Sequence, residues 1–403
     1  MAQQAAKQIS ISSPEFIRNP YPYYDELRSI NPIYKMDSFK YPGWYITGYE
    51  EVVTVLKNNA FKNRIPLPET TRKYQSLKNI QNNMMLFKNK QDHKRLRMLI
   101  SKGFTLTRMN KYRSYIKEVV HELLHEAENN KTIDVVTEFA FPLASLVIAK
   151  ILGIPEEDRK QFRKWALTLV PTIDFSRTRK TLENGNITVM RLVSYFTELI
   201  KKRKHSPEED LISMLLQDKQ QDDNELSDEE LLATCILLVI AGHETTVNLI
   251  SNAVLSFITH PEQLKKLTQN PALIELAIEE ILRYESPTQM TARTAAEEVE
   301  LNGNMIKKGD QVYLMLGAAN RDPRIFTEPH KLDITRNPNP HLAFGYGAHF
   351  CIGSTLARLE AQIAMQTLLK RFNNFAIATN DLQWRNLVGF RSLGTLKVTF
   401  SID

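Results

Sequence analysis

The sequence contains very little cysteine. Only Cys235 and Cys351 occur in a chain of 403 residues. Zinc sites and disulfide frameworks need several cysteines at defined spacings. The spacing of this pair therefore excludes a zinc site built from cysteine pairs, and two cysteines argue against a disulfide framework. It also provides too few ligands for an iron–sulfur cluster. A chain with so few thiols is typical of a reducing compartment, so we expect a cytoplasmic protein.

Long apolar runs are also absent from the sequence. Residues Met1–Lys7 do not form the apolar core of a signal peptide. No stretch reaches the roughly eighteen consecutive apolar residues that a membrane-spanning helix requires. Linkers rich in proline, glycine or serine and internal repeats are missing as well. We therefore expect no membrane span, and one domain over residues 1–403 with a disordered tail at about residues 1–13.

The chain has only a mild excess of positive charge. Its formal net charge of +6 is the difference between 52 basic and 46 acidic residues. Basic residues cluster in two stretches, residues 88–102 and 201–204. Aromatic residues do not alternate with these basic ones, which argues against a nucleic-acid partner. An acidic protein is the better match, because complementary charged patches steer two proteins together.

A glycine-rich stretch surrounds Cys351. It covers Phe344–Gly353, and its glycines allow tight turns and a close approach of the backbone to a flat ligand. A helical pattern of apolar residues begins after it. At this position free N–H groups and the helix dipole favour a negative sulfur and a lowered thiol pKa. Such a thiolate suits the axial position of a haem iron, whereas a buried structural cysteine is the alternative.

The longest predicted helix begins at Ser227 and ends near His260. Ser227 and Glu230 have the spacing of a capping box, and about thirty residues at 1.5 Å per residue span roughly 45 Å. Apolar residues fill nearly all sides of its first half, as in a buried central helix. The polar segment Ala241–Thr246 then interrupts the pattern. Glycine and polar residues lower the stability of the middle of a helix. Such a local violation of the pattern is expected at a functional site, so we expect this segment to have a function. The alternative is a kink whose polar residues are hydrogen-bonded to one another.

The remaining pattern predicts a mainly α-helical protein with a small β region. Residues 16–33 predict an entry segment and then a first helix that follows Pro20 and Pro22. Apolar periodicity favours helices over residues 50–58, 109–128, 133–152 and 271–283, and two helices within 165–203, around Pro171–Phe175. Short runs at residues 44–47, 312–316 and 396–400 favour strands. Residues 63–83 lack a sustained period and predict a long loop, and residues 219–225 predict a surface loop.

The stretch Phe344–Gly353 resembles the haem-binding loop of the cytochrome P-450 superfamily, Phe-Gly-x-Gly-x-His-x-Cys-x-Gly, and every defining position is filled. The resemblance implies the mostly helical haem-thiolate fold, with one long central helix crossing the haem. It implies haem b, or iron protoporphyrin IX, as the cofactor. Cys351 would then be the axial iron ligand, and His349 would bind a haem propionate. The other haem-binding positions of the loop are Phe344, Gly345 and Gly353.

Two further parts of the chain match the haem site of the same superfamily. Ala241-Gly242-x-Glu244-Thr245-Thr246 resembles its oxygen-activation motif. The resemblance implies that Ala241 and Gly242 contact the haem. It also implies that the Thr245 hydroxyl hydrogen-bonds dioxygen and that Glu244 relays protons for its cleavage. The remaining propionate ligands would be His93 and Arg97, four apart on one helix, and Arg293 at the start of a strand.

Glu280 and Arg283 match a structural pair of the superfamily, which a later arginine, here Arg336, completes. Taken alone, two such residues three apart would be an ordinary surface ion pair. The resemblance also places a mobile lid over the substrate pocket between residues 165 and 203. A geometric guess at the pocket residues selects Leu237, Leu238, Gln289, Met290 and Phe390.

The resemblance implies a monooxygenase, which activates dioxygen reductively and inserts oxygen into a C–H bond. Electrons would come from a ferredoxin or flavodoxin, because the chain has no segment for a flavin or iron–sulfur cluster. Four stretches also resemble the branch of the superfamily that serves biotin synthesis in bacilli: residues 40–44, 139–145, 241–252 and 283–291. That branch cleaves a C–C bond within a long fatty acyl chain, preferably carried on acyl carrier protein, to yield a pimeloyl unit.

Several alternatives remain open. A fatty-acid or polyketide hydroxylase of the same fold would leave the acyl substrate uncleaved. A peroxygenase would use hydrogen peroxide and would not need Glu244 and Thr245. A haem protein that only senses or binds gas would keep Cys351 but show no turnover. A nucleophilic cysteine enzyme would explain neither the paired glycines nor the distant motifs.

Overall fold

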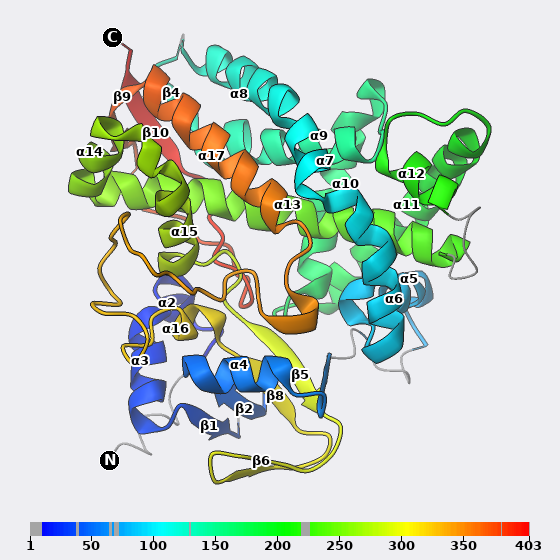
Figure 1. Cartoon of the computed structure of the whole chain (residues 1–403), viewed down its shortest axis with the longest axis vertical. Coiled ribbons are helices and arrows are strands. Elements are labelled where there is room, and N and C mark those ends of the chain that lie inside the picture. The colour runs from blue at the N-terminus through cyan, green and yellow to red at the C-terminus, as the bar shows by residue number, and fades with distance from the viewer. Residues whose placement is uncertain are drawn as a thin grey trace.

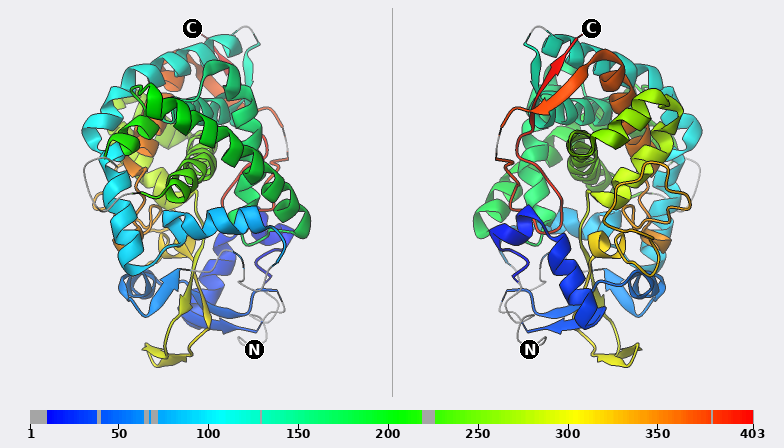
Figure 2. Two further views of the ribbon diagram at one scale, coloured as in Figure 1. Left: turned by 90° about the vertical axis from the view of Figure 1, so that its right-hand side faces the viewer. Right: turned by 90° about the vertical axis from the view of Figure 1, so that its left-hand side faces the viewer.

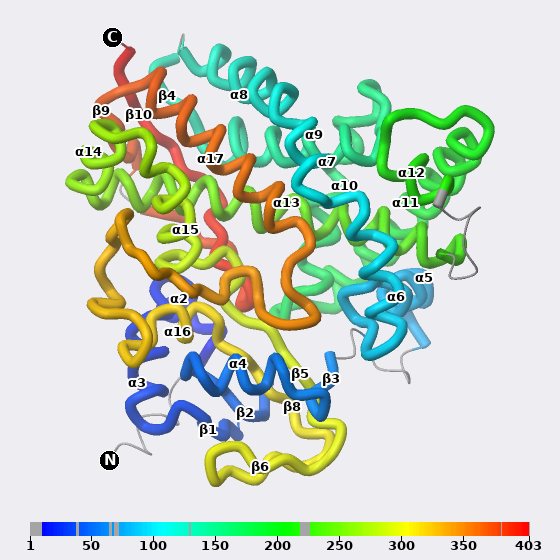
Figure 3. Tube along the Cα trace, viewed as in Figure 1, coloured from blue at the N-terminus to red at the C-terminus, as the bar shows by residue number. Residues whose placement is uncertain are grey.

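The computed structural model describes residues 10–37, 40–63, 67, 72–128, 130–218, 226–379 and 381–402. Helices form most of this part of the chain, while strands gather in small sheets at its two ends (Figures 1 and 3). The predicted fold class, mainly α-helical with a small β region, is therefore confirmed. The predicted surface loop at residues 219–225 lies outside the described residues.

The helices surround one long central helix. In chain order the α-helices are α2 (Pro14–Arg18), α3 (Tyr21–Ile30), α4 (Tyr49–Lys57), α5 (Gln75–Asn83), α6 (Lys90–Ser101), α7 (Leu106–Lys111), α8 (Arg113–Glu128), α9 (Phe141–Ile151), α10 (Arg159–Ile173), α11 (Arg179–His205), α12 (Leu211–Asp218), α13 (Asp228–Thr259), α14 (Pro261–Gln269), α15 (Ile274–Tyr284), α16 (Leu316–Ala319) and α17 (Ser354–Arg371). Shorter turns are η1 (Met85–Phe87), η2 (Lys102–Phe104), the π-helical η3 (Val135–Ala140), η4 (Glu156–Asp158), η5 (Pro271–Leu273) and η6 (Gly347–His349).

The strands form a five-stranded sheet, a three-stranded sheet and a hairpin. The first has the order β1 (Ile33–Met36), β2 (Gly43–Ile46), β8 (Gln311–Leu314), β5 (Thr291–Ala295) and β3 (Phe61–Asn63). The second has the order β4 (Thr132–Asp134), β10 (Lys397–Ser401) and β9 (Asn373–Ile377), and the hairpin is β6 (Val299–Leu301) with β7 (Asn304–Ile306). Strand β5 pairs antiparallel with β3 and β8, with Arg293 opposite both Asn63 and Val312. This pairing places Arg293 at the edge of the helical part.

Helix α13 runs through the centre of the molecule and is seen nearly end-on, inside the other helices, in Figure 2. It begins with the predicted capping box, in which the Ser227 hydroxyl accepts from the Glu230 N–H and the Glu230 carboxylate accepts from the Ser227 N–H. By length and hydropathy α13 could cross a membrane, but 83% of its most apolar stretch is buried inside the protein. The helix is long and apolar because it forms the core.

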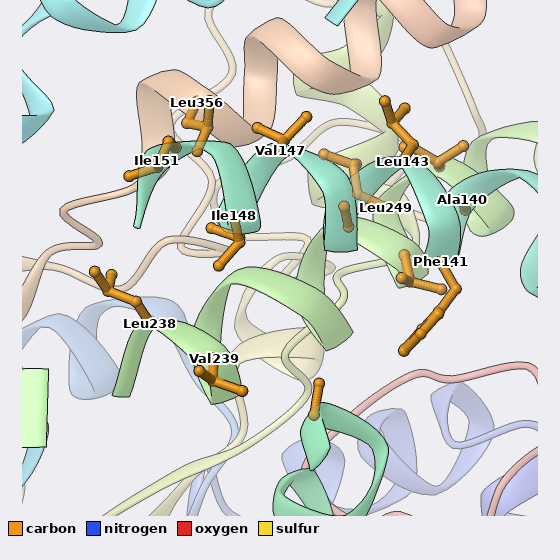
Figure 4. Packing of buried hydrophobic residues seen from close by; sticks show 14 of the residues in the cluster. Ala140, Phe141, Leu143, Val147, Ile148, Ile151, Leu238, Val239, Leu249 and Leu356 are labelled. Carbon is orange, nitrogen blue, oxygen red and sulfur yellow. The ribbon is translucent and has the colours of Figure 1, made fainter. Parts of the chain in front are cut away.

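The polar residues at Ala241–Thr246 interrupt the apolar pattern but not the helix, because α13 is continuous through them as the predicted single long helix requires. Gly242 is instead required by close packing. A Cβ at this position would lie 2.3 Å from the Cδ1 atom of Ile148 in α9. Figure 4 shows Ile148 between the two helices at this crossing. The glycine therefore lets α9 approach α13 closely.

Four other predicted elements differ from the observed ones. Helix α5 lies within the predicted loop at residues 63–83. The loop was predicted because a nine-residue helix with few buried positions shows little periodicity in its apolar residues. Residues 133–152 form strand, π-helix and α-helix in turn, since β4 pairs with the distant β10. The predicted entry segment before the first helix contains the short helix α2, and Pro171 lies inside α10.

The described part of the chain begins before the predicted end of the N-terminal tail. Residues 1–9 lie outside the described residues, but Ile11 is only 2% exposed and belongs to a hydrophobic cluster with Phe16 and Tyr24. The predicted boundary of the tail at about residue 13 is therefore too late. Burial of one isoleucine side chain stabilises this attachment by about 1.5–3 kcal/mol.

Candidate active site

A large cavity lies between α13, strand β5 and the loop before α17. Its volume is about 350 Å³, which lies within the range of about 300–1,000 Å³ that is usual for ligand pockets. The predicted site residues that line it are His93, Arg97, Leu237, Leu238, Ala241, Gly242, Glu244, Thr245, Met290, Arg293, Phe344, Gly345, His349, Cys351, Gly353 and Phe390. One cavity therefore joins the predicted haem-binding residues to most of the predicted substrate-pocket residues.

Gln289 is the predicted pocket residue that does not line the cavity. Its side chain is buried, and its amide accepts from the Tyr24 hydroxyl at 3.0 Å and donates to the Ser286 carbonyl at 2.8 Å. The adjacent Thr288 and Met290 line the cavity instead. Successive side chains of an extended segment point to opposite sides, so the prediction for Gln289 is wrong.

The Cys351 sulfur faces the cavity from the loop before α17. The loop turns at Gly345 and Gly347, whose φ angles are +72° and +71°, a region that residues with a side chain rarely adopt. The Cys351 N–H donates to the Phe344 carbonyl at 2.9 Å and closes the turn. The glycines therefore shape a loop that presents one sulfur atom to a large internal space.

The thiol pKa of Cys351 is raised, which contradicts the predicted lowering. The side chain is exposed, but to the interior of the cavity and not to bulk water. The resulting desolvation disfavours a free thiolate more strongly than the Gly353 N–H and the Arg97 charge favour it. A metal cation bound at the sulfur would supply the missing charge and stabilise the thiolate.

Two histidines and two arginines gather near Cys351. The ring centroids of His93 and His349 are 3.7 Å apart. Burial, assisted by the neighbouring arginines, lowers the histidine pKa values to about 4 for His93 and about 3 for His349. Burial likewise lowers the pKa of Arg293 to about 10. Among the described residues, the Arg97 guanidinium has neither a hydrogen bond nor an ion pair.

The two arginines make this group of four side chains a cation cluster that requires anions from a ligand, whereas the two histidines, with their lowered pKa values, are neutral near pH 7 and contribute N–H donors. A desolvated positive charge without a counter-charge is unfavourable, and within the described ranges no carboxylate forms an ion pair with Arg97 or Arg293. The two propionate groups of haem would provide such anions beside the sulfur ligand. The residues present therefore fit haem.

Glu244 and Thr245 are adjacent on α13 but have different partners. The Glu244 carboxylate is buried and accepts from the Arg385 guanidinium at 2.6 and 2.7 Å and from the Ser392 hydroxyl at 2.6 Å. The Thr245 hydroxyl donates to the Ala241 carbonyl at 3.0 Å. Arg385 and Ser392 were not among the predicted site residues, because no local sequence pattern connects them to Glu244, 141 and 148 positions away.

Glu360 is a further cavity residue, and it was not among the predicted site residues. It lies on α17 and is 1% exposed, and one of its carboxyl oxygens has no hydrogen-bond partner in the described part of the chain. Burial raises its pKa well above the ordinary range, which favours the neutral acid. The available signal was an acidic residue on the apolar face of the helix, next to Leu359.

Glu280, Arg283 and Arg336 make the contacts that the resemblance implied. Glu280 and Arg283 are fully buried and share two hydrogen bonds of 2.8 Å. The Arg336 Nε atom lies 3.2 and 3.1 Å from the two Glu280 carboxylate oxygens. The other Arg283 donors reach three backbone carbonyls in residues 320–331. This is a buried network and not an ordinary surface ion pair.

The turn between α10 and α11, within the predicted lid, forms part of the cavity wall. Asp174 and Phe175 line the cavity. The buried Asp174 carboxylate accepts from the backbone N–H groups of Val388 at 3.1 Å and Gly389 at 2.8 Å. These bonds attach the turn to the C-terminal segment that carries Phe390. The mobility of this lid stays a prediction.

Comparison with known proteins places this site in a family. The cytochrome P-450 family matches residues 13–383 of the chain. A biotin biosynthesis cytochrome P-450 of Bacillus subtilis is 57% identical over 391 residues, which cover 97% of this chain and 98% of that relative. A polyketide biosynthesis cytochrome P-450 of the same species is 38% identical over 400 residues, which cover 96% and 97%.

A solved structure is similar over the same extent. It is the crystal structure of a cytochrome P-450 in complex with acyl carrier protein ligated to hexadec-9Z-enoic acid. Its TM-score with this chain is 0.93 at 57% identity, and the match covers 96% of this chain and 100% of that one. The predictions of a haem-thiolate monooxygenase and of haem b as its cofactor are confirmed by this family match. The chain belongs to the cytochrome P-450 family.

Proposed function

We propose that this enzyme oxidatively cleaves a C–C bond within a long fatty acyl substrate, carrier-bound or free, to a pimeloyl unit for biotin biosynthesis. The observation that carries the proposal is the 57% identity, over nearly the whole of both sequences, with a relative named for biotin biosynthesis. Two neighbouring carbons would be hydroxylated in succession before the bond between them is cleaved. Apolar side chains suited to an alkyl group line the cavity, among them Ile148, Val170, Leu237, Leu238, Met290 and Phe390.

Haem b, when bound, supplies an iron that activates dioxygen for insertion into C–H bonds. Cys351 would hold this iron through its sulfur. The four groups of the cation cluster would bind the propionates, which offsets the cost of their burial. The remaining residues proposed to contact the haem are Ala241, Gly242, Phe344, Gly345 and Gly353.

Glu244 and Thr245 handle protons in this proposal. The Thr245 hydroxyl opens on the cavity and can donate to a ligand after it leaves the Ala241 carbonyl. The Glu244 side chain is 4% exposed, whereas that of its partner Arg385 is 28% exposed. Arg385 and Ser392 therefore hold the carboxylate between the cavity and solvent, where it can exchange protons with both.

Replacing Thr245 by alanine is expected to lower product formation by roughly a hundredfold, because a methyl group cannot pass on a proton. Substrate affinity should stay unchanged. The measurement is the ratio of product formed to NAD(P)H consumed by the reconstituted holoenzyme. Thr245→Ser keeps the hydroxyl and is the matched control, which should retain most of the ratio. An undiminished ratio in the alanine variant would contradict the proposed role.

The enzyme also needs partners. We propose that a ferredoxin or flavodoxin supplies electrons and that acyl carrier protein presents the acyl group, both in the cytoplasm. The structure of the 57%-identical relative with an acyl carrier protein supports the second partner. Such partners are acidic, and the exposed Lys90, Lys94 and Lys102 of α6 and η2 offer them positive charge.

The test of the proposed function is the mass spectrum of the products. The holoenzyme is incubated with a long-chain acyl carrier protein, a reductase system and dioxygen, and a pimeloyl product is expected. Products that are only hydroxylated would support the alternative, a fatty-acid or polyketide hydroxylase of the same fold, which the 38% identity with a polyketide relative also favours. Equal rates with hydrogen peroxide alone would support a peroxygenase.

A further inference from the structure

Arg358 connects helix α15 to the loop that carries Cys351. Its guanidinium donates from Nε and Nη2 to the two carboxylate oxygens of Glu279 in α15, each at 2.7 Å. The same guanidinium lies over the Phe344 ring, 4.5 Å from its centroid. The Phe344 carbonyl in turn accepts from the Cys351 N–H at 2.9 Å. Arg358 therefore contacts both a carboxylate and the residue that closes the turn at the sulfur.

The Glu279 carboxylate is held in its ionised form. His341 is a second donor to it: the His341 Nδ1 atom accepts from the Ala343 N–H at 3.3 Å, which leaves Nε2 to donate to Glu279 at 3.1 Å. Burial by itself would raise the pKa of Glu279, but the hydrogen bonds from Arg358 and His341 outweigh this effect and lower the pKa to about 2. Glu279 is therefore negatively charged near pH 7.

The charge of Arg358 acts on the Cys351 sulfur. Burial raises the pKa of this thiol, whereas the charges of Arg97 and Arg358 favour its thiolate form. Arg97 belongs to the cation cluster that fits the haem propionates, but Arg358 has the carboxylate of Glu279 as its counter-charge. The side chains of Arg358 and Glu279 are only 29% and 26% exposed, so solvent screens their charges incompletely. The net charge that the sulfur experiences therefore depends on this pair.

We propose that Glu279 and Arg358 set the reduction potential of the iron that Cys351 holds. Reduction from ferric to ferrous iron adds one electron, which a ferredoxin or flavodoxin would donate. A positive charge near the sulfur stabilises the reduced form, and a negative charge stabilises the oxidised form. Glu279 therefore keeps the potential lower than the charge of Arg358 alone would make it.

Both residues act through the Cys351 loop and do not contact the reacting atoms, so they are positioning residues. The inference requires the haem site but not the acyl substrate, and it goes beyond the proposed cleavage reaction. An ion pair that merely attached α15 to α17 would predict a loss of stability and no change in potential.

The test is a spectroelectrochemical titration of the substrate-free holoenzyme. Glu279→Gln removes the negative charge and should raise the ratio of ferrous to ferric iron at a fixed applied potential by about threefold to tenfold. A tenfold change corresponds to about 59 mV for one electron. Arg358→Gln should lower this ratio by a similar factor, because Glu279 loses its counter-charge. Arg358→Lys keeps the positive charge and should stay close to the wild type.

The double variant Glu279→Gln with Arg358→Gln separates charge from structure. It removes one charge of each sign, so its potential should return towards that of the wild type, whereas structural damage from the two substitutions would not cancel. The Soret band of the carbonyl-bound ferrous form should stay at the wild-type position in all of these variants, which would show that the sulfur still binds the iron.

Glu128→Gln is the matched control. Glu128 pairs with Arg371, and their side chains are 24% and 22% exposed, much like Glu279 and Arg358. Arg371 ends α17, about 20 Å along the helix from Arg358 at 1.5 Å per residue. The control should therefore keep the wild-type potential. Shifts of Glu279→Gln and Arg358→Gln in the same direction, or potentials equal to that of Glu128→Gln, would overturn the proposal.

Discussion

Replacing Cys351 by alanine is expected to reduce product formation to below detection. The side chain presents its sulfur to the cavity and makes the contact proposed for the haem iron. Haem could still be retained through the cation cluster, but without a thiolate its iron would lack the electron donation that favours O–O cleavage. The measurements are haem content and product yield, and circular dichroism should show an unchanged helical fold.

Cys235→Ala provides the matched control for this prediction. Cys235 is the other cysteine of the sequence, and it is 1% exposed within α13. Burial raises the pKa of its thiol, so this sulfur is an apolar core group and not a ligand. Its loss should lower stability slightly and leave turnover intact. Wild-type turnover in the Cys351 variant, or loss of turnover only in the Cys235 variant, would reject Cys351 as the iron ligand.

Replacing Arg283 by alanine is expected to lower the free energy of unfolding by roughly 3–5 kcal/mol. The substitution leaves the Glu280 carboxylate buried with one arginine instead of two. It also removes the donors that reach three backbone carbonyls between residues 320 and 331. Because this network joins α15 to the segment that leads to the Cys351 loop, haem content should fall as well. The measurements are the unfolding midpoint in denaturant and the haem-to-protein ratio.

Two variants make the prediction for Arg283 specific. The exposed pair Arg179–Glu183 is the surface counterpart, and Arg179→Gln should leave the midpoint unchanged. The double variant Glu280→Met with Arg283→Met removes both charges, and it should be more stable than Arg283→Ala, since no buried carboxylate is left with only one of its two arginines. A midpoint of Arg283→Ala equal to that of Arg179→Gln would show that the network contributes no stability.

The contiguous motifs were predictable because their chemistry depends on residues that are neighbours in the chain. The stretch Phe344–Gly353 contains the sulfur and the glycines that shape its loop, so both followed from one motif. The capping box of Ser227 and Glu230 placed the start of α13 correctly, because helical geometry brings residues three apart together. The mainly helical class followed from apolar periodicity in the same way.

Contacts between distant segments were not predictable from the residues alone. Arg385 and Ser392 bind Glu244 across more than a hundred residues, and Asp174 binds Val388 and Gly389 in the same manner. The rise in the Cys351 pKa also depends on tertiary structure, because desolvation by the cavity outweighs the local N–H groups. Gly242 seemed a helix-weakening residue until the position of Ile148 gave it a packing role.

The sequence by itself determined the haem-ligand loop, the long central helix and the family, because each depends on short spacings along the chain. Only the tertiary structure decided which charges are already paired and which remain open. It pairs Glu244 with Arg385 and leaves Arg97 without a hydrogen-bond partner among the described residues. The physical reason is that burial and pairing depend on the segments that fold against a residue, and these lie far away in the sequence.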